Sequence, residues 1–186
     1  MTVESVVRRL TAAGATTVLI DGRSGSGKST LADQLCARWE SSVVVRLDDI
    51  YPGWDGLAWA VDHIYRELLQ PRADGRRGCW RRWDWATGTA DGWNSVEPGR
   101  RLIVEGVGAL SRASSAVADL GIWVDTRDDV RKQRALQRDG DSFRPHWERW
   151  ARQEDTYIAG HTPRSAADIL VTETASGLIW TETNTR

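Results

Sequence analysis

The chain alternates between short, continuous apolar runs and longer segments in which apolar residues recur every three or four positions. Short runs rich in Val, Ile and Leu are typical of strands that are buried on both faces of a sheet. They predict five strands, and the tail predicts one further short strand. The five strands cover residues 17–21, 43–47, 101–105, 121–125 and 168–172, and the tail strand covers residues 178–181.

The segments between these runs have the period of an amphipathic helix. In residues 57–69, for example, Val61, Ile64 and Leu68 fall on one face. The same spacing predicts helices over residues 3–13, 28–40, 128–139 and 145–159. Strands that alternate with helices predict an α/β fold, with a doubly wound parallel sheet of five strands and helices on both faces.

Residues 71–99 interrupt this alternation and are rich in Gly, Arg and Trp. A segment of this length without clear periodicity is usually functional, or it holds short strands of its own. No internal repeat marks a second domain, and 186 residues is an ordinary length for one domain. We therefore expect a single domain over residues 1–186, with an insert at about 71–99 that forms part of an acceptor pocket.

The composition is that of an ordinary globular protein, with 40% hydrophobic and 27% charged residues. The formal net charge of −1 gives no general attraction to nucleic acid or to a membrane, so any affinity for phosphate must be local. No apolar run reaches the length of a membrane span, and the first residues lack the apolar core of a signal peptide. Cys36 and Cys79 are too few for a disulfide framework. These features predict a cytoplasmic protein without a nucleic-acid or membrane partner.

Residues 22–30 match the phosphate-binding pattern G-x-x-x-x-G-K-[ST]. The pattern directly follows a predicted strand and directly precedes a predicted helix. A turn of this kind points successive backbone N–H groups and a helix N-terminus at one place, which makes an anion site. The residues predicted to bind a nucleotide are Gly22, Ser24, Gly25, Ser26, Gly27, Lys28, Ser29 and Thr30.

Two side chains of this loop have distinct predicted roles. Lys28 would reach the β- and γ-phosphates, and the hydroxyl of Ser29 would hold Mg²⁺. Only Lys28 and Lys132 are lysines among the 25 basic residues of the chain. A sequence that uses Arg almost everywhere thus has Lys at the one position where a compact ammonium fits and a planar guanidinium does not. ATP and Mg²⁺ are the expected cofactors.

Carboxylates follow two predicted strands, at the ends where ligands collect in a parallel sheet. Asp48 and Asp49 follow the second strand, which is expected to lie next to the strand of the phosphate loop, and Glu105 ends the third. Asp48 could accept a proton from an acceptor hydroxyl as it attacks a phosphoryl group. Asp49 could instead cap a turn or bind metal through water, and the sequence does not choose firmly between them. Glu105 could orient Mg²⁺-bound water or the acceptor hydroxyl.

Arg131, Arg134 and Arg138 recur along one side of the helix predicted over residues 128–139. Such a stripe could clamp the transferring phosphates as a lid, with Arg134 and Arg138 as the preferred members. The alternative is a solvated helix face whose charge is balanced by neighbouring aspartates.

Four segments of the chain resemble the uridine kinase and phosphoribulokinase group of P-loop kinases. The first is the phosphate loop. The second, residues 47–51, is similar to the D-[DS]-F-Y motif of that group. The third comprises residues 82–85, 96–98 and 102–106, which resemble Y-D-F, V-E-P and I-[IV]-[EL]-E-G in order and spacing. The fourth, residues 131–139, resembles R-x-x-R-x-x-x-R-D of a lid helix.

This resemblance implies a P-loop NTPase fold with a short Arg-rich lid, and it implies that Asp48 is the base. It also implies that Asp84 and Trp85 lie in an acceptor pocket, where the ring would stack on a base or wall a sugar. Tyr51 is expected to line the same pocket. Trp stands at both aromatic positions around Asp84 and the insert is short, so the acceptor need not be uridine.

The first functional hypothesis is an ATP-dependent phosphotransferase that phosphorylates a hydroxyl of a small metabolite, either a nucleoside or a related sugar. The second, from another class, is a nucleotide-binding regulatory module that hydrolyses ATP slowly. A kinase needs the base and the W-D-W pocket, whereas a regulatory module needs neither. The sequence leaves open the acceptor, the choice of ATP or GTP as donor, and whether the chain forms a homo-oligomer.

Overall fold

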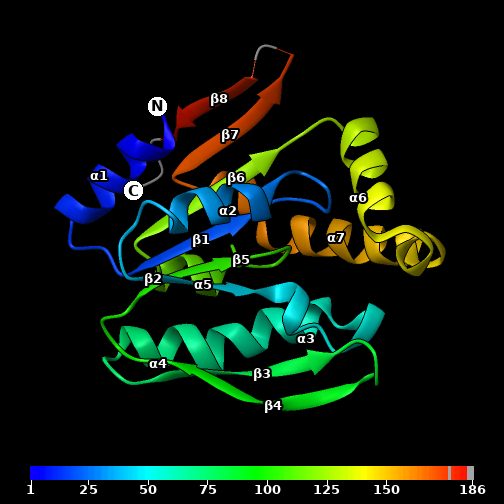
Figure 1. Ribbon diagram of the computed structural model, residues 1–186, viewed down its shortest axis with the longest axis horizontal. Coiled ribbons are helices and arrows are strands. Elements are labelled where there is room, and N and C mark those ends of the chain that lie inside the picture. The colour runs from blue at the N-terminus through cyan, green and yellow to red at the C-terminus, as the bar shows by residue number, and fades with distance from the viewer. Residues whose placement is uncertain (176, 184–186) are drawn as a thin grey trace.

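The computed structural model describes residues 1–175 and 177–183, which form a six-stranded sheet with helices on both faces and a separate two-stranded hairpin (Figure 1). The sheet has the order β2-β5-β1-β6-β7-β8. Its strands are β1 (Thr17–Asp21), β2 (Ser42–Arg46), β5 (Arg101–Glu105), β6 (Leu120–Asp125), β7 (Ile169–Thr174) and β8 (Gly177–Glu182). The first five are parallel, which confirms the predicted α/β sheet, and β8 joins β7 as an antiparallel sixth strand at the edge.

The strand that leads into the phosphate loop lies in the middle of the sheet. Val18, Leu19 and Ile20 of β1 are completely buried, because β1 has a strand on each side and helices above and below. The expectation that β2 is the neighbour of β1 is wrong, since β5 lies between them. The carboxylate beside the phosphate loop is therefore that of Glu105, and Asp48 lies one strand further away.

One face of the sheet is covered by α1 (Val3–Ala12) and α2 (Lys28–Cys36). Thr2 begins α1 with a capping box, in which the Thr2 hydroxyl accepts from the Ser5 N–H and the Ser5 hydroxyl accepts from the Thr2 N–H. The helix predicted to run to residue 40 ends at Cys36, because the chain turns there and buries Trp39 completely.

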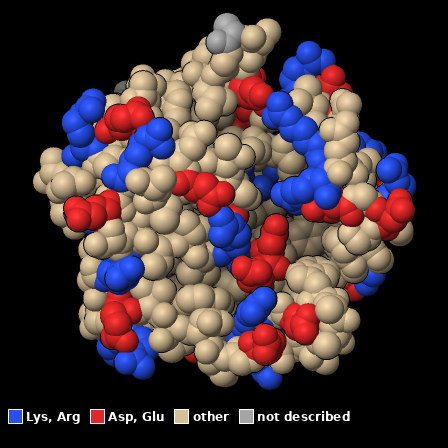
Figure 2. Space-filling view, viewed as in Figure 1, with Lys and Arg blue, Asp and Glu red and all other residues tan. Residues whose placement is uncertain are grey.

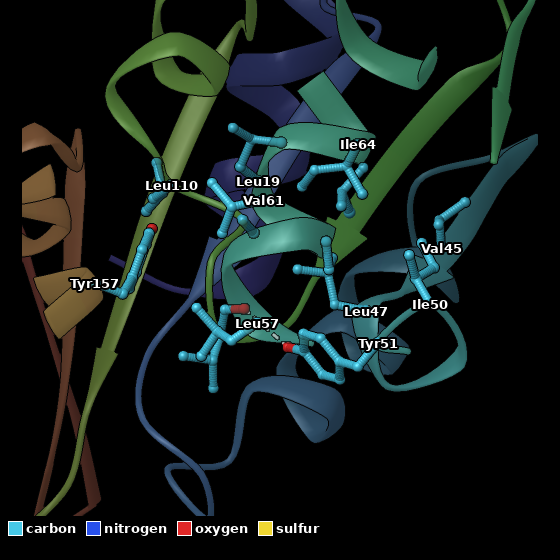
Figure 3. Close-up of a cluster of buried hydrophobic side chains, with 14 of the residues drawn as sticks. Leu19, Val45, Leu47, Ile50, Tyr51, Leu57, Val61, Ile64, Leu110 and Tyr157 are labelled. Atoms are coloured by element: carbon cyan, nitrogen blue, oxygen red, sulfur yellow. Dashed lines mark hydrogen bonds between the residues drawn. The ribbon is translucent and has the colours of Figure 1, made fainter. Parts of the chain in front are cut away.

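The opposite face is covered by a long helical segment and by α7 (Trp147–His161). The long segment consists of α3 (Leu57–His63), a π-helical stretch (Ile64–Leu69) and α4 (Gln70–Ala73). Its apolar side contributes Leu57, Val61 and Ile64. These residues belong to one buried cluster with Leu19 of β1 and with Leu47, which follows β2 (Figure 3). The short helices α5 (Arg112–Val117) and α8 (Pro163–Ala166) were not predicted.

The insert at residues 71–99 contains the end of this helical segment and an antiparallel hairpin of β3 (Gly78–Asp84) and β4 (Thr89–Val96). The helical segment continues through Pro71, which comes directly after the π-helical stretch and Gln70. The hairpin packs beneath the π-helical stretch (Figure 1). At Gly78 a side chain would collide with the main-chain oxygen of Leu68, so this glycine permits the close approach.

The predicted lid is α6 (Asp128–Phe143), which projects from the end of β6. Gly140 breaks this helix with φ 53° and ψ −130°, a conformation that L side chains rarely adopt. The chain then makes a 3₁₀ turn (Arg144–His146) and enters α7. Two further 3₁₀ turns, Leu47–Asp49 and Gly53–Asp55, follow β2. No helix in the described part of the chain is long and apolar enough to span a membrane.

Candidate active site

The phosphate loop connects β1 to α2, as predicted, and its glycines permit close packing. At Gly22 a Cβ would collide with the main-chain oxygen of Val124, and at Gly25 with that of Arg131. Gly27 takes a left-handed conformation, φ 96°, at the start of α2. Only glycine fits these positions without strain, so the loop depends on its glycines for shape as well as for access to phosphate.

Lys28 and Ser26 of the loop are both buried. The Lys28 ammonium donates to the main-chain oxygen of Arg23 at 3.1 Å, which folds the side chain over the loop. The Ser26 hydroxyl is buried and has no hydrogen-bond partner within residues 1–175 and 177–183. A buried hydroxyl without a partner is unfavourable, and an oxygen of a bound phosphate would satisfy it.

Asp21, the last residue of β1, fixes the start of the loop. Its carboxylate accepts from the N–H of Gly22 at 2.6 Å, from the N–H of Leu110 at 2.9 Å and from the hydroxyl of Tyr157 at 2.6 Å. Burial raises the pKa of Asp21, and the hydrogen bond from Tyr157 opposes that rise. The sequence analysis did not single out Asp21, because an Asp before a phosphate loop carries no signal of its own.

Glu105 ends β5 directly beside the loop and is 2% exposed. Its carboxylate lies 3.4 Å from the Arg46 guanidinium. Burial raises the pKa of Glu105, while the charge of Lys28 and the nearby Ser29 side chain lower it in part. The pair of a hydroxyl and a carboxylate is chemically suited to Mg²⁺, which prefers oxygen ligands.

No group of three or more His, Cys, Asp or Glu side chains that could hold a metal ion occurs among the residues described. Mg²⁺ is usually held by one or two protein oxygens together with substrate phosphates and water.

A cleft of about 570 Å³ opens beside the loop, between the lid and the body of the protein. In Figure 2 a hollow in this face is bordered by basic and acidic side chains. Aromatic rings form a large part of its walls, and charged or hydroxyl groups line the remainder. The lining residues are Ser24, Ser29, Arg46, Asp48, Tyr51, Trp54, Trp85, Arg138, Asp139, Ser142, Phe143 and Trp150.

The cleft includes Asp48 but not Asp49. Both residues lie in the 3₁₀ turn after β2 and both are exposed. The main-chain oxygen of Asp48 accepts a hydrogen bond from the Trp85 indole at 2.7 Å, which ties the tip of the hairpin to this turn.

Tyr51 and Trp85 both line the cleft, and they do so in different ways. Tyr51 is 2% exposed, and its hydroxyl donates to the main-chain oxygen of Val107 at 2.8 Å. Burial keeps the pKa of Tyr51 well above its ordinary value, so Tyr51 presents a neutral ring edge-on to Trp150. Trp85 is 41% exposed and forms an outer wall.

Asp84 does not line the cleft. Its carboxylate accepts from the Ala86 N–H at 2.8 Å and from the Thr87 hydroxyl at 2.9 Å, so it caps the turn at the tip of the hairpin. These hydrogen bonds lower the pKa of Asp84. Its predicted place in an acceptor pocket stays a prediction.

The lid brings two arginines to the phosphate loop. Arg134 and Arg138 border a hollow of about 260 Å³ over Gly25, Lys28 and Ser29, and Arg138 also lines the larger cleft. Arg134 forms a bidentate pair with Glu173 of β7, at 2.6 and 2.8 Å.

Arg138 and Arg131, the other members of the stripe, differ in exposure. Arg138 pairs with Asp139 at 2.7 Å, and Asp139, together with the charges of Asp48 and Glu105, raises the pKa of Arg138. Arg131 is buried at the base of the lid and lines neither hollow.

Trp54 is a further aromatic candidate from the sequence, where Tyr51 and Trp85 are preferred as pocket residues. Its ring stacks on Phe143 at 5.3 Å and on His146 at 4.5 Å between ring centroids. It thereby joins the turn at Gly53–Asp55 to the far end of the lid. Trp54 stands in a loop segment, Pro-Gly-Trp-Asp, where a large apolar residue among turn formers is the only available signal.

No family model matches the chain, and no curated protein sequence matches it. Its fold is similar to that of a possible uridine kinase from Bacillus stearothermophilus, with a TM-score of 0.65 and 20% identity over 90% of this chain and 96% of that chain. It is also similar to that of a candidate fructose transport system kinase from Silicibacter sp. TM1040, with a TM-score of 0.55 and 22% identity over 90% of this chain and 95% of that chain. These similarities confirm the predicted P-loop NTPase fold.

Proposed function

We propose that the protein is an ATP-dependent phosphotransferase that phosphorylates a hydroxyl of a small metabolite, a nucleoside or a related sugar. The observation that carries this proposal is that a single cleft joins the phosphate loop, through Ser29, to Asp48 and to an aromatic wall. A protein that only binds or slowly hydrolyses a nucleotide has no need for a second compartment beside the phosphate loop.

The phosphate loop would hold the triphosphate of the donor. Its backbone N–H groups, the N-terminus of α2 and the ammonium of Lys28 all favour negative charge at one place. The buried hydroxyl of Ser26 supports this assignment, since it lacks a partner within the described residues. When bound, Mg²⁺ would neutralise charge that develops on the transferred phosphoryl group, and Ser29 and Glu105 are the side chains placed to hold it.

Asp48 is the preferred base because it lines the cleft, whereas Asp49 does not. Exposure at the cleft keeps the carboxylate available to accept the proton of an acceptor hydroxyl. Asp49 would then act only through water or not at all.

The aromatic wall supports an acceptor with a flat or partly apolar body. Trp54, Trp85 and Trp150 offer ring faces or edges, and Ser142 offers a hydroxyl to the same space. Rings of this kind pack on the face of a base or on the C–H face of a sugar. The similar structures, described as a possible uridine kinase and a candidate fructose transport system kinase, support a nucleoside or a sugar as the class of acceptor.

The lid would complete the site around the transferring group. Arg138 already borders both the cleft and the hollow over the phosphate loop, which supports it as the lid residue that would contact the transferring phosphoryl group. Arg134 would have to exchange Glu173 for phosphate, and a bidentate pair that is half exposed can be exchanged at small cost.

The test is a phosphorylation screen of the purified protein with ATP, Mg²⁺ and a panel of nucleosides, sugars and polyols. The proposal predicts that one class of acceptor stimulates ATP turnover strongly and yields a monophosphate product by mass spectrometry. Equal, slow turnover with every acceptor and no phosphorylated product would instead favour the regulatory module.

A further inference from the structure

Glu154 of α7 reaches the phosphate loop from below and is 1% exposed. One carboxylate oxygen accepts from the backbone N–H of Ser24 at 2.9 Å and from its hydroxyl at 2.7 Å. The other oxygen accepts from the Arg23 guanidinium at 2.9 Å. A single buried carboxylate thus holds two consecutive residues of the loop by three hydrogen bonds.

The direction of the Ser24 hydroxyl is fixed by a further residue of the same helix. The Trp150 indole N–H donates to the Ser24 oxygen at 3.0 Å, so the hydroxyl proton is directed at Glu154. Because the Ser24 N–H is also taken, this residue has no free donor for a phosphate. The loop is therefore divided into an anchored half, residues 23–24, and a half from Gly25 onward that Glu154 does not hold and in which the Ser26 N–H closes a turn on the main-chain oxygen of Arg23.

The same carboxylate also faces the base of the lid. The Arg131 guanidinium lies 3.7 Å from Glu154, and its side chain is 7% exposed. One of its terminal nitrogens has no hydrogen-bond partner within the part of the chain described, and its main-chain oxygen lies against Gly25. Glu154 therefore sits between one guanidinium from the loop and one from the lid helix.

Burying a carboxylate is costly unless it is paired and hydrogen-bonded, and apolar residues often serve a core equally well. The polar partners of Glu154 are Arg23, Ser24 and Arg131, which all belong to the loop or to the base of the lid. A carboxylate placed in this way stabilises one conformation of these two elements rather than the sheet beneath them.

We propose that Glu154 is a positioning residue that holds the phosphate loop in the conformation ready for the donor triphosphate and ties that conformation to the base of the lid. This inference rests on the proposed function for the identity of the donor. Glu154 touches no reacting atom; its effect passes through Arg23, Ser24 and Arg131.

Glu154→Gln tests the proposal, because it keeps the size of the side chain and removes the charge that both guanidinium groups face. Calorimetry with MgATP or MgADP, without any acceptor, gives the dissociation constant, and steady-state kinetics give separate KM values for donor and acceptor. We expect donor affinity to fall about tenfold, the equivalent of one charge-assisted hydrogen bond, while the acceptor KM changes less than about twofold. Glu148→Gln on the same helix is the control, since Glu148 is exposed and pairs only with Lys132 among the interactions described here.

Arg23→Gln provides a second variant that keeps the test informative if Glu154→Gln does not fold. It removes one partner of the same carboxylate from the more exposed side and should also weaken nucleotide binding. If both variants fold, their effects on the nucleotide dissociation constant should be strongly non-additive.

The proposal is overturned if Glu154→Gln lowers thermal stability but binds nucleotide as tightly as the wild type. It is overturned equally if the two effects simply add. Failure of the wild-type protein to bind any nucleoside triphosphate would have a different meaning, because it would remove the proposed function itself and this inference with it.

Discussion

The indole N–H of Trp85 donates a 2.7 Å hydrogen bond to the main-chain oxygen of Asp48. This bond joins the tip of the β3–β4 hairpin to the turn that carries the proposed base, although the two residues are 37 positions apart in sequence. The hairpin thereby forms one wall of the cleft and also fixes the turn in place.

Trp85→Phe keeps an aromatic wall and removes this one donor. We expect the acceptor KM to rise by roughly three- to tenfold, as for the loss of one neutral hydrogen bond, and the ATP KM to stay nearly constant. Steady-state kinetics at saturating concentration of the other substrate would measure both. Trp93→Phe is the control, since Trp93 lies on the same hairpin, is 59% exposed and does not line the cleft. Equal changes in the two variants would contradict the role of the Trp85 hydrogen bond.

Lys28→Ala should reduce kcat/KM for ATP by roughly 10²-fold or more, because it removes a preorganised charge from the phosphate position. Thermal unfolding should change little, since the Lys28 ammonium makes one hydrogen bond to the loop itself. The other lysine offers a matched control, because Lys132 is half exposed and pairs with Glu148. Turnover near the wild-type value in Lys28→Ala would show that this loop is not the phosphate site.

The strands and the phosphate loop could be predicted because their signals are local. Three consecutive apolar residues, Val18 to Ile20, mark β1 as a buried strand, and nine consecutive residues mark the loop. The strand order could not be predicted in the same way, since the insertion of β5 between β1 and β2 is a long-range pairing. Short strands within residues 71–99 were one expected alternative, but their positions could not be predicted, because β4 is mostly exposed and has no alternation of apolar and polar residues.

The residues of the candidate site also differ in whether a local sequence signal marks them. Ser29, Asp48, Glu105 and Arg138 stand at the ends of strands or in motifs, and the structure brings them around one cleft or beside it. Glu154 lies 130 positions from Ser24 within a charged helix pattern, where nothing in the sequence separates it from solvated neighbours. Its role follows only from the packing of α7 under the loop.

Glu105→Gln tests the electrostatics of the proposed metal site. Burial raises the pKa of Glu105 above its ordinary value of 4.5, so the folded protein binds this proton more tightly than the unfolded chain. Stability from this group is therefore present at low pH and falls as pH rises from 4.5 through the folded pKa. Glutamine does not ionise, so the variant does not lose this stability as pH rises. Its melting temperature without ligands should therefore exceed that of the wild type at pH 7, and the difference should shrink toward pH 4.

The same variant should lose Mg²⁺-dependent turnover, so stability and activity should move in opposite directions. Glu97→Gln is the control, because Glu97 pairs with Arg77 at the surface. A melting temperature for Glu105→Gln at pH 7 that equals or falls below that of the wild type would contradict this account of Glu105.

Arg138→Ala and Arg134→Ala should lower kcat more than they weaken ATP binding, because a lid clamp acts on charge that shifts in the transition state. For Arg138, which faces both hollows, we expect a loss of roughly 10²-fold in kcat. Arg127→Ala is the control, as Arg127 pairs with Asp129 at the start of the same helix and is highly exposed. Unchanged kcat in both lid variants would show that these arginines form a solvated helix face and do not act on the phosphates.

The central claim is that Asp48 accepts the proton of an acceptor hydroxyl, and the comparison of Asp48→Asn with Asp49→Asn tests it most directly. Phosphoryl transfer to the best acceptor from the screen is measured for both variants, together with ATP affinity and basal ATP hydrolysis. Asp48→Asn should slow transfer by about 10² to 10⁴-fold, as for loss of a general base. ATP affinity should be nearly unchanged and basal hydrolysis less affected, and Asp49→Asn should be the milder change throughout. Greater damage from Asp49→Asn than from Asp48→Asn would contradict the assignment, and normal transfer in both variants would place the acceptor site elsewhere.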